Sequence, residues 1–304
     1  MFLDSAGSSL PPQPVLATVI EHLRREAEVG GYVAAAERAD DLAAVRDSIA
    51  RLIGASPVEI ALVDSATPCV VNFFTSIPLG PGDRVLLSQV EYASNAITAL
   101  HRAKETGASV EVVPSDPSAG STWTPSLGCS TTASRWCRSF TSPTNGGLIN
   151  PVREVVDLAH RHGALGLLDA CQSVGQLPID VGALGVDALS ATGRKWLRGP
   201  RGTGFLYLRG APRPRTEALA MDLHGRSGCR PTSTCPPRMR RASSCGNAMW
   251  LLDWGWGVAV DYLLSLGSTM RPVRSRPAPN GFGNELDAWR ACRSTISQPT
   301  AAAS

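Results

Sequence analysis

Short apolar runs alternate with longer amphipathic stretches along the first two thirds of the chain. The apolar runs predict buried strands at residues 60–63, 84–88, 109–113, 165–172, 187–191 and 204–208. The amphipathic stretches predict helices over about residues 14–28, 40–53, 91–106 and 151–162, with another beginning at residue 67, and several end at glycine. Strands that alternate with helices predict an α/β fold with a mostly parallel sheet flanked by helices.

Three stretches interrupt this pattern, at about residues 121–140, 226–250 and 268–304. The first two hold seven arginines and no acidic residue, and none of the three has a usable periodicity. A helical pattern returns between them at residues 257–267. One hypothesis is that the interrupting stretches are read in a shifted coding frame, which resequencing of the DNA tests. The alternative is a natural disordered insert.

This pattern indicates how the chain is divided. We expect a large α/β domain over residues 1–225, with an aberrant insert at 121–140. Residues 226–304 are expected to hold a mostly irregular remnant of a truncated, small carboxy-terminal domain.

Composition narrows the class of protein. The chain has 304 residues, of which 43% are hydrophobic and 18% charged, as in soluble proteins with a sizeable core. A net charge of +3 is too small to indicate binding to nucleic acid. No signal peptide and no apolar run of about 20 residues is found, so we expect a cytoplasmic protein without membrane contact. The eight cysteines show no close metal-ligand pairs, so no metal is expected.

The turn at residues 191–204 carries the most informative single residue. The chain has only two lysines, Lys104 and Lys195, and all its other basic side chains apart from histidine are arginine. Arginine stays protonated, whereas a lysine amine can lose its proton and attack a carbonyl. Lys195 is therefore a candidate nucleophile, and a solvated surface lysine is the alternative.

Two further places have the composition of a binding site. Asp169 lies toward the carboxyl end of the buried strand predicted at residues 165–172, and ligands gather at the carboxyl ends of parallel strands; a helix cap is the alternative. Residues 64–68 predict a strand, a turn of small residues and a helix start with Pro68 at its first position, which suits a phosphate or an ordinary cap. The glycine-rich residues 199–204 lead into a strand, which disfavours a nucleotide-binding turn. Cys69 and Cys171 are interpreted as buried packing residues.

Three of these segments occur in an order that resembles a known family. They are DSAT at residues 64–67, LDACQ at 168–172 and GRKWLRGPRGTG at 193–204. Together they resemble the class V, fold type I pyridoxal-phosphate-dependent aminotransferases. RKWLRGPRGTG, together with EAEVGGY at residues 26–32, looks most like the branch that contains isopenicillin-N epimerase and the carbon–sulfur lyase of ergothioneine synthesis.

The resemblance implies a role for each candidate residue. Lys195 would form an aldimine with pyridoxal 5'-phosphate and then move the α-proton of the substrate. Asp169 would hold the pyridine nitrogen protonated. The other implied cofactor contacts are Gln172 at the phenolic oxygen, Tyr92 stacked on the ring where histidine is usual, Ala66, Thr67, Thr192 and Arg194 at the phosphate, and Thr144 or Asn145 near the cofactor oxygen.

The implied function is that of a pyridoxal-phosphate enzyme acting on an amino acid, as a transaminase, an epimerase or a carbon–sulfur lyase. A cysteine desulfurase ranks lower, because its mobile cysteine would fall in the irregular carboxy-terminal region. A catalytically inactive, frameshift-damaged relic is the alternative, because the arginine that usually binds the substrate carboxylate would fall there too. The resemblance also implies a homodimer.

Overall fold

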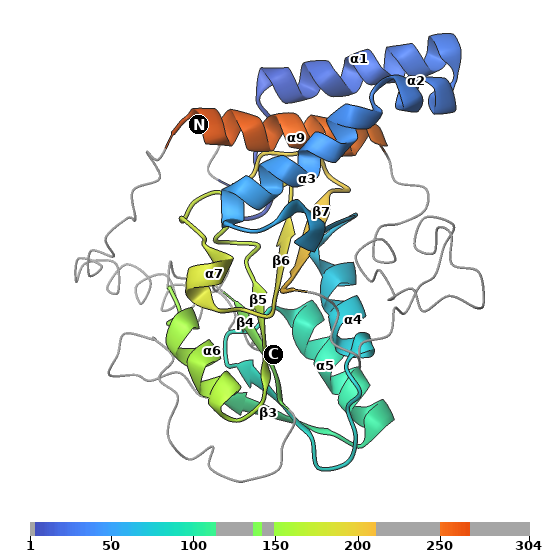
Figure 1. Cartoon of the computed structure of the whole chain (residues 1–304). Coiled ribbons are helices and arrows are strands. Elements are labelled where there is room, and N and C mark those ends of the chain that lie inside the picture. The colour runs from blue at the N-terminus through green and yellow to red at the C-terminus, as the bar shows by residue number, and fades with distance from the viewer. Residues whose placement is uncertain (1–3, 114–135, 142–148, 211–249, 268–304) are drawn as a thin grey trace, which may run out of the picture.

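The computed structural model describes residues 4–113, 136–141, 149–210 and 250–267, and the statements below concern these residues. Seven strands form one sheet in the order β1-β7-β6-β5-β4-β2-β3 (Figure 1). Strand β7 runs antiparallel to β1 and β6, and the other four pairings are parallel. The predicted α/β fold with a mostly parallel sheet is therefore confirmed. The strands are β1 (Ile60–Val63), β2 (Arg84–Ser88), β3 (Ser109–Val113), β4 (Trp136–Thr141), β5 (Leu165–Asp169), β6 (Ala188–Thr192) and β7 (Gly204–Leu208).

Helices cover both faces of this sheet. In Figure 1, α4 and α5 lie on one side of the strands, and α1, α3 and α9 lie together at another. No helix in the described ranges is long and apolar enough to cross a membrane. The helices are α1 (Gln13–Val29), α2 (Gly31–Glu37), α3 (Ala39–Ile53), α4 (Ala66–Ser76), α5 (Ala93–Thr106), α6 (Val152–Arg161), α7 (Val181–Leu184) and α9 (Trp250–Ser265), with a 3-10 turn, η1 (Pro57–Glu59).

The alternation of side chains along β1 shows how the two faces are buried. Ile60 and Leu62 pack into a core built with α3, α6 and α9. Ala61 and Val63 point the other way, into a core built with α4 and α5. Successive residues of a strand face opposite sides of a sheet, so a strand buried on both faces is apolar throughout. The continuous apolar runs in the sequence have this cause.

Several elements differ from the sequence-based expectations, and β5 ends at Asp169 instead of residue 172. Residues 136–141, most of which belong to the stretch without usable periodicity, form β4, a strand paired with both β2 and β5. Helix α2 follows α1 directly where only a break was expected. Helix α4 begins at Ala66, with Ser65 as its cap, one residue before the predicted start. Helix α9 begins at Trp250, seven residues earlier than predicted. The division into a domain over 1–225 and a remnant over 226–304 stays a prediction.

Candidate active site

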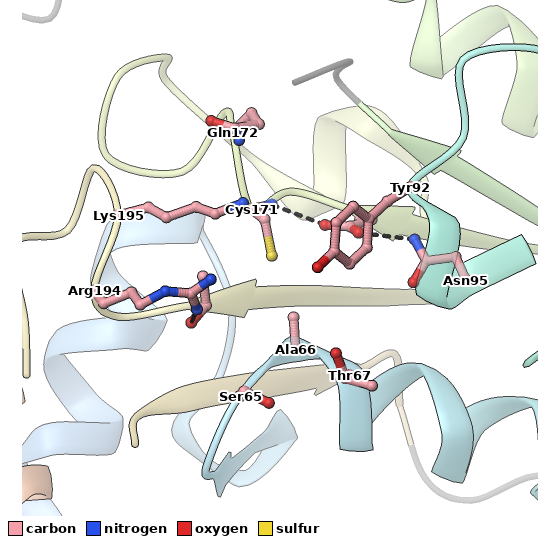
Figure 2. Close-up of a pocket in the computed structure, with 11 residues that line it drawn as sticks. Ser65, Ala66, Thr67, Tyr92, Asn95, Cys171, Gln172, Arg194 and Lys195 are labelled. Carbon is pink, nitrogen blue, oxygen red and sulfur yellow. Dashed lines mark hydrogen bonds between the residues drawn. The ribbon is translucent and has the colours of Figure 1, made fainter. Parts of the chain in front are cut away.

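A pocket of about 200 Å³ lies at the carboxyl ends of β5 and β6, beside the start of α4 (Figure 2). Figure 2 shows Lys195 and Arg194 on one side, Tyr92 and Asn95 on the opposite side, and Ala66 and Thr67 below. Eight predicted site residues meet here, and Thr144 and Asn145 lie outside the described residues. The pocket is lined by Ser65, Ala66, Thr67, Tyr92, Asn95, Asp169, Cys171, Gln172, Thr192, Arg194 and Lys195.

Asp169 presents a buried carboxylate at the end of β5. Its side chain is only 4% exposed. Oδ1 accepts the backbone N–H of Cys171 at 3.0 Å, and Oδ2 accepts the amide Nδ2 of Asn95 at 2.8 Å. The residues that follow form a turn rather than a helix, so Asp169 is not a helix cap. Each oxygen takes one of these hydrogen bonds and has a second lone pair for another donor.

Lys195 is buried, which excludes the solvated surface lysine. It is 8% exposed and belongs to the turn between β6 and β7. The N–H of Gly199 donates to the carbonyl of Gly193 at 2.8 Å and closes that turn. Nζ lies 5.9 Å from the centre of the Tyr92 ring and makes no hydrogen bond or ion pair with another described residue. A buried amine without such a partner is suited to react.

The start of α4, Thr192 and Arg194 form a face of the pocket that is suited to anions, called the anion-binding face below. Helix α4 starts at Ala66, and the Ser65 side chain makes no capping bond to it. The first N–H groups of a helix carry partial positive charge and bind anions. Arg194 donates through Nη1 to the Thr192 hydroxyl at 3.0 Å and forms no ion pair with a described carboxylate. The helix start, the hydroxyl and the guanidinium together suit a phosphate group.

The Gln172 amide is fixed by the protein at both ends. Its Nε2 donates to the carbonyl of Ala6 at 3.1 Å, and its Oε1 accepts the indole N–H of Trp196 at 2.8 Å. These two hydrogen bonds therefore fix the orientation of the Gln172 amide in the pocket. The expected contact with the phenolic oxygen stays a prediction.

Cys171 lines the pocket instead of serving only in packing. Burial, and then the charge of Asp169, raises the pKa of the Cys171 thiol well above its usual range. The same two causes raise the pKa of the Cys69 thiol. A thiol with a raised pKa stays protonated near neutral pH and is a poor nucleophile. Neither side chain is therefore an activated cysteine.

Sequence reasoning missed Asn95, which is 2% exposed and bonded to Asp169. A signal was present in the helical spacing of α5. The buried residues of that helix are Asn95, Ala99 and Ala103, which recur every four positions. An amide at the head of an otherwise apolar stripe must find a polar partner inside the protein.

Comparison with known proteins identifies the family. The model of the family "Aminotransferase class-V" matches residues 1–222. This chain belongs to the class V aminotransferases. A probable cysteine desulfurase of Halalkalibacterium halodurans is 31% identical over 215 residues, which are 68% of this chain and 52% of the relative. The cysteine desulfurase of Serratia proteamaculans is 31% identical over 277 residues, 88% of this chain and 67% of the relative. The chain thus spans about half to two thirds of these relatives.

Solved structures show that the class V chain has the fold type I architecture. The cystine C–S lyase C-DES, in a variant with glycine covalently linked to its pyridoxal-phosphate cofactor, superposes with a TM-score of 0.77. The identity is 20%, and the match covers 86% of this chain and 71% of that one. The same lyase has been solved with its reaction product cysteine persulfide, with the same score. At this identity the likeness supports the fold alone.

The pocket residues fit the cofactor of class V aminotransferases, pyridoxal phosphate. The aldehyde of this cofactor needs an amine to react with, its protonated ring nitrogen needs a hydrogen-bond acceptor, and its phosphate needs hydrogen-bond donors. Lys195, Asp169 and the face formed by α4 and Arg194 meet these needs around one cavity. Family membership and this fit confirm the expected cofactor. The role of each residue is a proposal.

Proposed function

We propose that this class V chain is a pyridoxal-phosphate-dependent enzyme that cleaves the carbon–sulfur bond of a cysteine-type amino acid. The observation that carries the proposal is the pocket, where a buried amine, a buried carboxylate and an anion-binding face converge. The relatives quoted above are cysteine desulfurases, and their substrate class supports a sulfur-containing amino acid.

Each residue has a defined task in this proposal. When bound, pyridoxal phosphate supplies an electron sink that weakens the bonds at the substrate's α-carbon. Lys195 holds the cofactor's aldehyde carbon and, once displaced by substrate, takes the α-proton. Asp169 would accept a hydrogen bond from the protonated ring nitrogen, and Tyr92 would cover the ring. The phosphate is bound by Ala66, Thr67, Thr192 and Arg194, while Gln172 and either Thr144 or Asn145 serve the phenolic oxygen.

The relatives revise the order in which the possible reactions were ranked. A desulfurase was placed below the transaminase, epimerase and lyase types, yet the relatives favour carbon–sulfur cleavage and lend no support to the epimerase branch. The two thiols next to Asp169, Cys69 and Cys171, are protonated and poorly suited to accept sulfur. We therefore propose that the sulfur is released from the pocket as part of a product, and is not transferred to a pocket cysteine.

The first experiment asks where the cofactor is attached. The purified chain is loaded with pyridoxal phosphate, reduced with borohydride and mapped by peptide mass. The label is expected on Lys195, with Lys104→Arg as the matched control that keeps it. A label on Lys104, or on neither lysine, would sink the proposal.

The second experiment separates the reaction types by product. L-cysteine and L-cystine are supplied, and pyruvate, alanine and sulfur products are measured. Pyruvate with sulfide or persulfide indicates lyase-type elimination. Alanine with a protein-bound persulfide indicates a desulfurase, and formation of neither product contradicts carbon–sulfur cleavage.

An inactive relic is the second candidate, favoured by the arginine-rich, acid-poor stretches in the sequence. Such a chain would bind the cofactor at Lys195, but its absorbance band would not change when amino acids are added. We also propose a homodimer, which sedimentation of the loaded protein tests.

A further inference from the structure

Asn95 joins two carboxylates inside the protein. Its amide nitrogen Nδ2 lies 2.8 Å from Oδ2 of Asp169 and 2.9 Å from Oε1 of Glu91. An amide NH₂ has two hydrogens, so each carboxylate receives one. The partners also fix the orientation of the amide, because the flipped group would place its carbonyl oxygen against two acceptors.

The same contacts tie together two parts of the pocket that are distant in sequence. Oε1 of Glu91 also accepts the backbone N–H of Tyr92 at 3.0 Å. Tyr92 and Asn95 both lie at the start of α5, and the N–H of Asn95 donates to the Tyr92 carbonyl at 2.9 Å. Asn95 therefore connects the segment that carries Tyr92 with the carboxylate at the end of β5.

The geometry at Asp169 shows what this connection does. One oxygen is held by the backbone of Cys171, and the other is held by Asn95. With both oxygens held, the plane of the carboxylate cannot turn freely, and its unused lone pairs keep one direction. Removing Asn95 leaves only the backbone bond, about which the carboxylate can turn.

We propose that Asn95 is a positioning residue for Asp169, orienting its carboxylate toward the cofactor's ring nitrogen; this inference rests on the proposed function. By fixing the direction of this carboxylate, Asn95 also helps Asp169 hold the N–H of that nitrogen in a hydrogen bond. In this role Asn95 acts through Asp169.

The test uses the whole chain loaded with pyridoxal phosphate labelled with ¹⁵N in the ring. Asn95→Leu keeps the approximate size of the side chain but removes both donated hydrogen bonds, and Asn95→Ser shortens the side chain. Thr98→Ala is the matched control, because the Thr98 hydroxyl on the same helix donates only to the Ser94 carbonyl among described residues. The ring-nitrogen chemical shift and the dissociation constant of the cofactor are measured for each.

We expect both Asn95 variants to move the ring-nitrogen resonance toward that of a neutral pyridine. Cofactor affinity should fall about tenfold, as when other residues that orient a ligand-binding side chain are removed. Thr98→Ala should leave both values unchanged. If Asn95→Leu does not fold, Asn95→Ser decides the matter alone.

An unchanged ring-nitrogen resonance in a folded, loaded Asn95 variant would overturn the inference and leave the proposed function standing. A wild-type chain that takes no cofactor on Lys195 would instead overturn the proposed function, and the role of Asn95 with it.

Discussion

The replacement Gly204→Ala tests how the anion-binding face is built. Gly204 begins β7 and pairs with Val63 of β1 and Thr192 of β6. A Cβ added there would lie 2.8 Å from both the Cα and the carbonyl carbon of Ser65, and 3.0 Å from the carbonyl oxygen of Ala191. Carbon atoms normally approach to about 3.5 to 4.0 Å, so the overlap is roughly 0.7 Å or more. All three atoms are backbone, so no side-chain rotation relieves it.

The cost follows from what must move. Relief requires β7 to separate from Ser65, the residue that caps α4, and so changes the distance between the helix start and Thr192. Overpacking of this kind costs about 1 to 3 kcal/mol of unfolding free energy. Reduced entropy of the unfolded chain returns only about 0.4 to 1 kcal/mol. We expect a net loss of stability together with weaker binding of pyridoxal phosphate.

The assay compares urea unfolding and cofactor titration for Gly204→Ala and Gly80→Ala. Gly80 is the matched control, because its added Cβ would meet only one atom, at 3.9 Å. Gly80→Ala should change the unfolding free energy by less than about 1 kcal/mol and leave affinity intact. The reasoning is refuted if Gly204→Ala equals Gly80→Ala in both measurements.

Three further predictions concern other parts of the site and its support. Lys195→Ala should abolish the borohydride label, which Lys104→Ala should keep; a label retained in Lys195→Ala contradicts the assignment. Burial raises the pKa of Asp253 from 3.8 to about 7, so the stability it contributes is complete below pH 3.8 and is lost as the pH rises through about 7. In urea melts, the unfolding free energy of Asp253→Asn minus that of wild type should therefore rise by roughly 2 to 3 kcal/mol between pH 5 and pH 8. Parallel plots of unfolding free energy against pH for the two proteins would contradict this. Trp256→Ala should lose about 3 to 5 kcal/mol in the same melts, because the indole is fully buried; a loss below about 1 kcal/mol would show that the packing is not needed.

The sequence was sufficient for the parts of the site that local patterns encode. Asp169 ends the apolar strand β5 and Lys195 lies in the turn after β6, and the carboxyl ends of neighbouring parallel strands share one edge of a sheet. The helix start at Ala66 was recognised, within one residue, from the small residues after β1. For these three positions the local sequence patterns predict the candidate site residues, and the fold brings the three segments together around one pocket.

Features set by distant partners were not predicted. Asn95 is separated by 74 residues from Asp169, and only the folded chain shows that its amide has that partner. The backbone of β4 is paired on both edges, with β2 and β5, although most of its residues belong to an acid-free stretch without usable periodicity. Pairing with two existing strands can impose an extended conformation that local preference does not encode.

Helix α9 shows how a segment beyond residue 225 supports the turn that carries Lys195. Trp256 fills the space beside Gly193 and Gly199, where an added Cβ would lie 2.9 Å from its Nε1 and 2.6 Å from its Cδ1. Neither glycine has a positive φ angle, so glycine is needed here for close approach and not for backbone freedom. The turn that carries Lys195 is thus held by packing against an indole about 60 residues away in the chain. Because α9 packs against this turn, the acid-free stretch before Trp250 does not by itself indicate loss of the site.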